Sequence, residues 1–370
     1  MKASNTAKKE SSIEVLLKEQ EGFSLIELLM SIVIFMVVMG AIYGLLALAR
    51  TDRNMSSEQS DLMKQLRYTL NLMGRDALNA GYSYQKNGAV VPDNFIATRL
   101  GVNSDLDTNR DLLVGVVAGN NIFDNSLQEP AGLQRTDAVS FVYRDVSFNP
   151  DPVTQTSRTV SIASAAAASG DVARLTLSAG NNTSVCRVND LYLVESQSSA
   201  VLVMATALPT ASTIEFAQGD PLSVNQKLSQ SILRPCINGD DENCMDYPAS
   251  IKRVYWVSFK VKNDGTLVRI VYGNNGNNSQ QIQEQPLAYG IENLQIKYLM
   301  QDGTVTDDPA AGPDGVLGTG DDTPINLNLV RQVRFEVTAR GNDTDPRTGK
   351  RNRITLQGTF STRNMGYDVG

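Results

Sequence analysis

An apolar segment near the N-terminus constrains this chain more than any other feature. Residues Leu25 to Ala49 contain a single charged side chain, Glu27. Such a run has the ~20 residues that a bilayer-spanning helix needs, and it is longer than the roughly 7–15-residue apolar core of a cleaved signal peptide. A carboxylate near the start of a spanning helix costs roughly 2.5–3.5 kcal/mol, so Glu27 is expected to have a partner.

The helical pattern continues beyond the apolar run. Apolar side chains recur at spacings of three and four residues, while the charged residues, Asp76 among them, are expected mostly on the solvent side. The apolar positions are Met55, Leu62, Leu66, Leu70, Met73 and Ala77. No proline interrupts residues 23–80, so we expect one helix of about 55 residues, roughly 80 Å long, that ends at Gly81. Gly40 and Gly44 form a G-x-x-x-G pair, which indicates either a close-packing face or a locally weak stretch of helix.

The string GFSLIELL begins at Gly22. It resembles the processing site of type IV prepilins and type II secretion pseudopilins. The resemblance implies that a prepilin peptidase cleaves after Gly22, that Phe23 is then N-methylated, and that Glu27 pairs with the terminal amine of a neighbouring subunit during filament assembly. The alternative interpretation is a single-pass anchor with a stray glutamate.

Composition excludes several other classes of function. The 370 residues carry a net charge of −7 and no histidine. Mild acidity disfavours nucleic acid as a partner, and the basic residues near the C-terminus are interleaved with acids. Without histidine there is no Ser-His-Asp or Cys-His catalysis, and neither a G-x-S-x-G nor a P-loop string is present, so we expect no enzyme. Of the three cysteines, Cys236 and Cys244 are expected to form a disulfide, with Cys186 free and buried.

Beyond Gly81 the chain alternates short strand-like runs with loops rich in Gly, Asn, Ser and Pro. The clearest hairpin joins residues 253–262 to 266–272 through Asp264-Gly265, which supplies the positive φ of a tight turn. The Ala/Ser-rich segment Ser161–Gly170 is expected to be a loop or a short helix. The other strands are expected at residues 137–144, 172–177, 191–194, 213–216, 286–298, 328–340 and 352–363.

Two further segments resemble PilW-type minor pilins and J-type pseudopilins: residues 66–82, at the predicted helix end, and the phrase GIENLQIKY with the strand that follows it. The fold expected from this resemblance is α+β, with a long N-terminal helix packed on an antiparallel β-rich head. The expected organisation is a leader (1–22), a transmembrane half-helix (23–50), an amphipathic half-helix (51–81), a β-rich insertion (82–250) and a pilin-like sheet (251–370).

Two acidic loops have the oxygen-rich pattern that Ca²⁺ prefers. In the Asp/Gly-rich loop 307–322 the candidate ligands are Asp314, Asp321 and Asp322, and the glycines let the backbone fold tightly around a cation. The earlier loop offers Asp105, Asp107, Asn109 and Asp111, but it lacks the glutamate at the twelfth position of an EF-hand loop. Solvated acidic turns are the alternative at both places, and zinc is disfavoured because histidine is absent.

The resemblance favours a minor pilin that primes type IV pilus assembly or lies in the pilus tip complex. Its expected partners are other pilins, the prepilin peptidase and the inner-membrane assembly platform. Its expected location is the inner membrane, crossed once with a periplasmic head, and later the pilus filament or tip. The alternatives are a J-type pseudopilin of a type II secretion system and a pilus-tip adhesin whose loops are stabilised by calcium.

Overall fold

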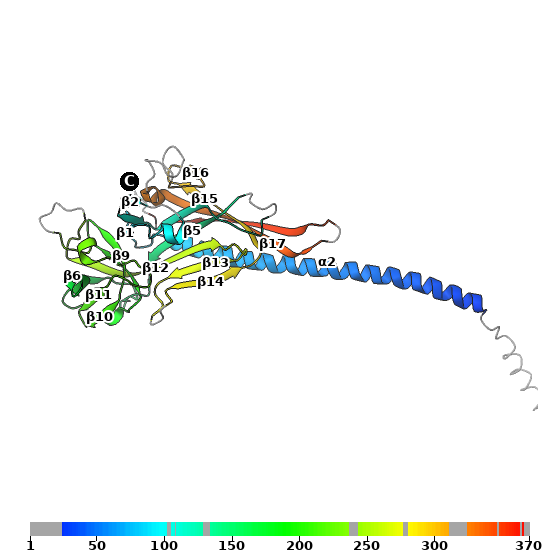
Figure 1. The fold of residues 1–370 in the computed structure, drawn as a ribbon, viewed down its shortest axis with the longest axis horizontal. Coiled ribbons are helices and arrows are strands. Elements are labelled where there is room, and N and C mark those ends of the chain that lie inside the picture. The colour runs from blue at the N-terminus through cyan, green and yellow to red at the C-terminus, as the bar shows by residue number, and fades with distance from the viewer. Residues whose placement is uncertain are drawn as a thin grey trace, which may run out of the picture. The chain divides into compact units, whose positions relative to one another are not determined.

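The computed structural model describes residues 24–101, 105–107, 109–128, 134–236, 243–276, 280–310, 324–345, 348–362 and 365. It divides the chain into two compact units, Met1–Glu58 and Gln59–Gly370. Helix α2 (Leu25–Asn79) passes through the boundary between them and is 55 residues long (Figure 1). The structure confirms the α+β fold, with one long helix and a β-rich head.

Helix α2 ends as the sequence predicts. Gly81 has a φ of +72°, a left-handed conformation that glycine adopts without steric cost. The N–H of Gly81 donates a hydrogen bond to the carbonyl oxygen of Val142 at 2.9 Å, so the helix end is fastened directly to the sheet. Within the second unit, the buried stripe of the helix consists of Leu62, Leu66, Leu70, Met73 and Ala77.

The larger sheet contains fourteen of the described strands, and its pairing is antiparallel except for a parallel contact between β1 and β9. These strands are β1 (Ala89–Pro92), β2 (Asp105–Asp107), β3 (Arg110–Leu113), β4 (Val116–Phe123), β5 (Thr136–Arg144), β6 (Val160–Ala168), β7 (Val172–Leu177), β8 (Leu191–Glu195), β9 (Ala200–Met204), β10 (Ala207–Thr210), β11 (Thr213–Phe216), β12 (Ala249–Val261), β13 (Leu267–Tyr272) and β14 (Ile282–Ala288). Short helical segments lie between them: α3 (Ala97–Leu100), η1 (Thr183–Val185) and η2 (Leu228–Gln230).

Strand β12 links two parts of this sheet. Its first residues pair with β6 and β8, whereas Val254 onward pairs with β5 and β13. The boundary expected at residues 250 and 251 therefore falls inside one continuous strand. Arg253 lies at the crossing point, where its Nε donates to Asp145 at 2.7 Å and its Nη1 donates to Asp190 at 2.8 Å. Both carboxylates are buried, so this ion-pair cluster fixes the place where the strand changes partners.

The smaller sheet has the strand order β16-β15-β17-β18. Its elements are β15 (Ile291–Met300), β16 (Val305–Thr306), β17 (Val330–Thr344) and β18 (Arg351–Ser361), with η3 (Pro324–Leu329) before β17. The helix approaches β18 closely at Gly74, where an added Cβ would lie 2.1 Å from Cε1 of Phe360. A larger residue at position 74 would therefore force the Phe360 ring to move.

Asp137 of β5 connects the larger sheet to strand β15 of the smaller sheet. One carboxylate oxygen accepts from the N–H of Asn121 at 2.8 Å, and the other accepts from the N–H of Ile296 in β15 at 2.6 Å. A carboxylate thus satisfies two backbone donors that the strand ladders leave without partners. Burial, reinforced by Asp307 and Asp308, raises the pKa of Asp137 to about 6 despite these hydrogen bonds.

Three expectations need correction or refinement. Ser161–Gly170 is mostly strand β6 rather than a loop or helix, because β7 supplies a pairing partner and Ile162 and Ala165 are buried. Residues 286–298 are not one strand but parts of β14 and β15, separated by a turn at Gly290 with φ +70°. Asp76 is fully buried rather than solvent-facing, because Arg269 of β13 provides it with a counter-ion.

Candidate processing and assembly site

The first turn of helix α2 is closed by two reciprocal hydrogen bonds. The N–H of Ile26 donates to Oγ of Ser24 at 3.3 Å, and the N–H of Ser24 donates to Oε2 of Glu27 at 3.1 Å. This is a capping box, in which a serine and a glutamate three residues later satisfy backbone donors that the helix itself leaves open. The Ser24-x-x-Glu27 spacing was readable from the sequence, but Glu27 was considered there only for its cost in the membrane and its pairing with a neighbouring subunit.

The capping box gives Glu27 a partner within its own chain. Its carboxylate is at the N-terminal end of the helix, where the helix dipole also favours negative charge. The side chain is exposed, and only Oε2 takes part in the capping box. Cleavage after residue 22 would preserve the Ser24 N–H, so the box is compatible with a mature chain that begins at Phe23. Gly22 and Phe23 themselves lie outside the described residues.

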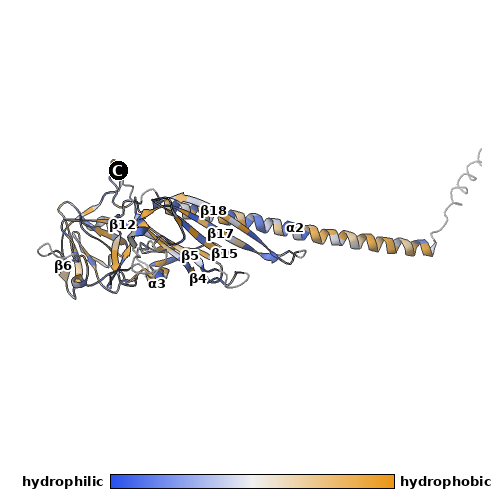
Figure 2. Ribbon diagram, turned by 90° about the horizontal axis from the view of Figure 1, so that it is seen from above, coloured by the Kyte–Doolittle hydropathy of each residue, from blue (hydrophilic) through white to orange (hydrophobic). Residues whose placement is uncertain are grey.

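The helix that follows presents an apolar surface on every side. Between Leu25 and Leu48 the large apolar side chains other than Met39, which is half-buried, are 42–78% exposed. Figure 2 shows this hydrophobic colouring in the N-terminal part of α2. In length and composition α2 could cross a membrane, and its most apolar window is unburied. A Cβ added at Gly40 or Gly44 would meet nothing within 4 Å, so both positions are open for close approach by another helix.

The other end of α2 is held to the head by charge. Arg269 of β13 donates from Nε to Asp76 at 2.7 Å, and the Tyr143 hydroxyl of β5 donates to the same carboxylate at 3.1 Å. Burial and the Asp76 charge raise the pKa of Tyr143, which keeps this hydroxyl a donor. The helix is thereby fixed in register on two strands of the sheet.

A family model for the prokaryotic N-terminal methylation motif matches residues 17–43. This match covers the residues just before the expected cleavage position, the capping box and most of the apolar run from Leu25 to Ala49. The chain therefore carries the N-terminal motif of type IV pilins and other prepilin-type proteins. A search of curated proteins finds no match. The motif and the apolar helix are consistent with membrane anchoring and pilus association, and they imply interactions with the prepilin peptidase and with other pilins in general.

The acidic loops of this pilin-like protein are only partly described. Asp314, Asp321 and Asp322 lie outside the described residues. Asp105 and Asp107 lie in β2, which pairs with β3 instead of forming a closed loop, and nothing is described of their side chains. Asp111 is buried in β3, where it accepts a hydrogen bond from the N–H of Ile96 at 3.1 Å, and Asn109 is exposed. No cluster of three potential metal-ligating His, Cys, Asp or Glu side chains occurs in the described part of the chain.

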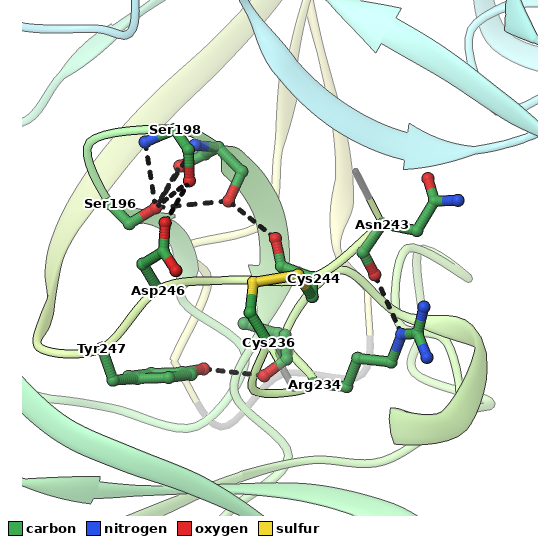
Figure 3. The surroundings of a disulfide bond; sticks show 10 residues. Ser196, Ser198, Arg234, Cys236, Asn243, Cys244, Asp246 and Tyr247 are labelled. Carbon is green, nitrogen blue, oxygen red and sulfur yellow. Dashed lines mark hydrogen bonds between the residues drawn. A yellow bond between two sulfur atoms is a disulfide. The ribbon is translucent and has the colours of Figure 1, made fainter. Parts of the chain in front are cut away.

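A disulfide bond joins Cys236 to Cys244 within the head (Figure 3). Next to it, the N–H of Met245 donates to the carbonyl oxygen of Arg234 at 2.9 Å, and the Tyr247 hydroxyl donates to the carbonyl oxygen of Leu233 at 2.8 Å. Cys186 is a free thiol and is buried beside Tyr192, and burial raises its pKa to about 11. A thiol with a raised pKa is a poor nucleophile, so the environment of Cys186 is that of a core residue.

Proposed function

We propose that this type IV pilin-like protein is a minor pilin, which primes pilus assembly or lies in the pilus tip complex and performs no catalysis. The observation that carries the proposal is helix α2, which begins at the methylation motif and continues without interruption into the head. A helix of this kind can be held in the membrane before assembly and can pack among the helices of other pilins afterwards.

Glu27 is the residue on which assembly depends in this proposal. In the free subunit its carboxylate is satisfied by the N–H of Ser24. In the filament it would bind the methylated amine of a neighbouring Phe23, because an opposite charge offsets the cost of a carboxylate in an apolar surrounding. The capping box therefore holds the acid at the helix start until a neighbour arrives.

The size of the head supports a pilus rather than a secretion filament. Its larger sheet alone has fourteen described strands, whereas the heads of J-type pseudopilins are usually much smaller. A J-type pseudopilin of a type II secretion system remains the second candidate, because the same methylation motif occurs in both systems. Calcium binding at Asp314, Asp321 and Asp322 is a further proposal, based on the Asp/Gly-rich sequence alone.

A filament incorporation assay tests the role of Glu27. Wild type, Glu27→Gln and the control Asp61→Asn are expressed in cells that lack the native copy. We expect all three chains in the membrane fraction and only Glu27→Gln to be depleted from sheared pili, by about tenfold or more if the lost contact is worth at least about 1.4 kcal/mol. The exposed Asp61 on the same helix pairs only with Lys64 at 3.1 Å.

Equal recovery of Glu27→Gln and wild type in pili would contradict the proposal.

Deletion of the gene distinguishes the two filament systems. Loss of surface pili with normal export of secreted enzymes supports the minor pilin. Normal surface pili with loss of enzyme export would assign the protein to the secretion filament.

A further inference from the structure

A polar cleft lies between the C-terminal part of helix α2 and the strands β13 and β14. It has a volume of about 430 Å³, within the range of small-molecule sites. Its lining comes from α2, β5, β12, β13 and β14, all within the second unit. The side chains that the argument uses are Arg75, Asn79, Tyr143, Tyr255, Gln283 and Gln285.

Two tyrosine rings form an aromatic wall of the cleft. The rings of Tyr143 and Tyr255 are 5.8 Å apart and inclined at 42° to each other, and both side chains are half-buried. The Tyr143 hydroxyl is held by Asp76. A half-buried aromatic face with its polar end fixed offers a flat apolar surface to a ligand that is itself part apolar and part polar.

The part of the lining that β14 supplies, on the same sheet face as the tyrosines, carries amides that are already oriented. Gln283 donates from Nε2 to the carbonyl oxygen of Gly273 at 3.0 Å, and Gln285 accepts at Oε1 from Arg269 at 3.3 Å. Each amide has both a donor and an acceptor, so Oε1 of Gln283 and the NH₂ group of Gln285 can still bind a ligand. Asn274 is fixed in the same way, because its Nδ2 donates to the carbonyl oxygen of Val254 at 2.8 Å.

The charged side chains at the cleft, Arg75, Arg269 and Asp76, sum to a net charge of +1. Asp76 is fully buried and neutralises Arg269, whereas Arg75 has its Nε 3.7 Å from Asp76 and is 63% exposed. A guanidinium at the rim suits a carboxylate, to which it can bind through two parallel hydrogen bonds. The lining combines these polar groups with two aromatic side chains and one aliphatic side chain, Val271, so it suits a ligand that is part apolar and part polar.

We propose that this cleft binds a saccharide that carries a carboxylate. The apolar C–H face of a pyranose ring would stack on Tyr255, its hydroxyl groups would bind the amides of Gln283 and Gln285, and its carboxylate would bind Arg75. Hydrogen bonds hold Tyr143, Gln283 and Gln285 before binding, which lowers the conformational entropy lost when a ligand binds. The inference does not depend on which filament the protein joins.

Saturation-transfer NMR on the full-length chain tests the site, in a detergent that has no sugar headgroup. The probes are glucuronic, galacturonic and N-acetylneuraminic acids, and the uncharged sugars glucose and galactose are the control ligands. We expect saturable binding of at least one acidic sugar and weaker binding of the neutral ones. Tyr255→Ala should weaken that binding by about tenfold or more, and Gln283→Leu should weaken it as well.

Two variants make the result specific. Arg75→Gln should remove the preference for the acidic sugar over its neutral partner, while Tyr289→Ala, an exposed tyrosine outside the cleft, should bind as wild type does. The melting temperature of each variant shows that it is folded. The assignment is overturned if no acidic sugar binds saturably, or if the folded Tyr255→Ala and Gln283→Leu variants both bind as wild type does. It is also overturned if a tetraglutamate peptide binds in a Tyr255-dependent manner and no sugar does.

Discussion

The two halves of helix α2 are both rich in apolar side chains, but they use them differently. From Leu25 to Leu48 the apolar side chains surround the helix and are exposed. In the second half, one stripe (Leu62, Leu66, Leu70, Met73 and Ala77) is at most 8% exposed, and charged residues occupy much of the remaining surface. The second half is therefore part of the head's core, whereas the first is a surface that requires lipid or neighbouring helices.

The largest expected change in stability follows from replacing Asp76. This residue forms the ion pair with Arg269 that joins the second half of the helix to the sheet. Replacing Asp76 by leucine leaves Arg269 buried without a counter-ion, which typically costs about 3–5 kcal/mol of folding free energy. Urea denaturation of the full-length chain measures it, with Asp61→Asn as a control expected to change stability by less than about 0.5 kcal/mol. The double variant Asp76→Leu/Arg269→Met should recover much of the loss. If Asp76→Leu is as stable as wild type, the helix is not held by this contact.

Glycine substitutions sharpen the comparison between the halves. Gly74→Ala places a Cβ against Phe360 and should destabilise the head by about 1–3 kcal/mol, because the packed core has no room for it. Gly44→Ala meets no neighbouring atom and should leave the melting temperature of the head unchanged. Phe360→Leu should relieve part of the Gly74→Ala penalty. Equal effects of the two alanine variants would contradict the difference between the halves.

A change of pH should have a smaller effect on folding stability, and this effect should also be confined to the head. Asp137 has a pKa raised to about 6, above the usual value of an unfolded aspartate, so the folded state binds the proton more tightly. Its contribution to stability is therefore fully present below about pH 4 and is lost as pH rises through about 6. Between pH 5 and pH 7 this loss is about 1 kcal/mol. Asp137→Asn should reduce the change in melting temperature between these pH values, and an unchanged difference would show that Asp137 does not titrate in this range.

The parts of the fold that depend on local sequence were predictable. The helix follows from its periodicity and lack of proline, and the β12–β13 hairpin follows from Asp264-Gly265, whose glycine has a φ of +76°. Segment Ser161–Gly170 was wrongly assigned because alanine and serine have low strand propensity, and only pairing with β7 makes it a strand. Asp76 was placed on the wrong side of the helix because its partner Arg269 lies 193 residues away.

The methylation motif was predicted from the sequence, but the local geometry at the start of α2 was not. The glycine, phenylalanine and glutamate at positions 22, 23 and 27 indicated the motif that the family model matches. The capping box needed only the spacing of Ser24 and Glu27, and was overlooked because Glu27 was considered only as a charge in lipid and as a partner for a neighbouring subunit. The sharing of β12 between two sets of strands could not be predicted, because strand partners distant in sequence leave no local pattern.

The most direct test of the account is the mass of the N-terminal peptide of the protein isolated from its native membranes. The account predicts a mature chain that begins at N-methylated Phe23, with the Ser24–Glu27 capping box one residue from the new amine. A chain that still carries Met1–Gly22 in wild-type cells would contradict it. The apolar half of α2 would then be a membrane anchor only, and Glu27 would have no amine to bind in a filament.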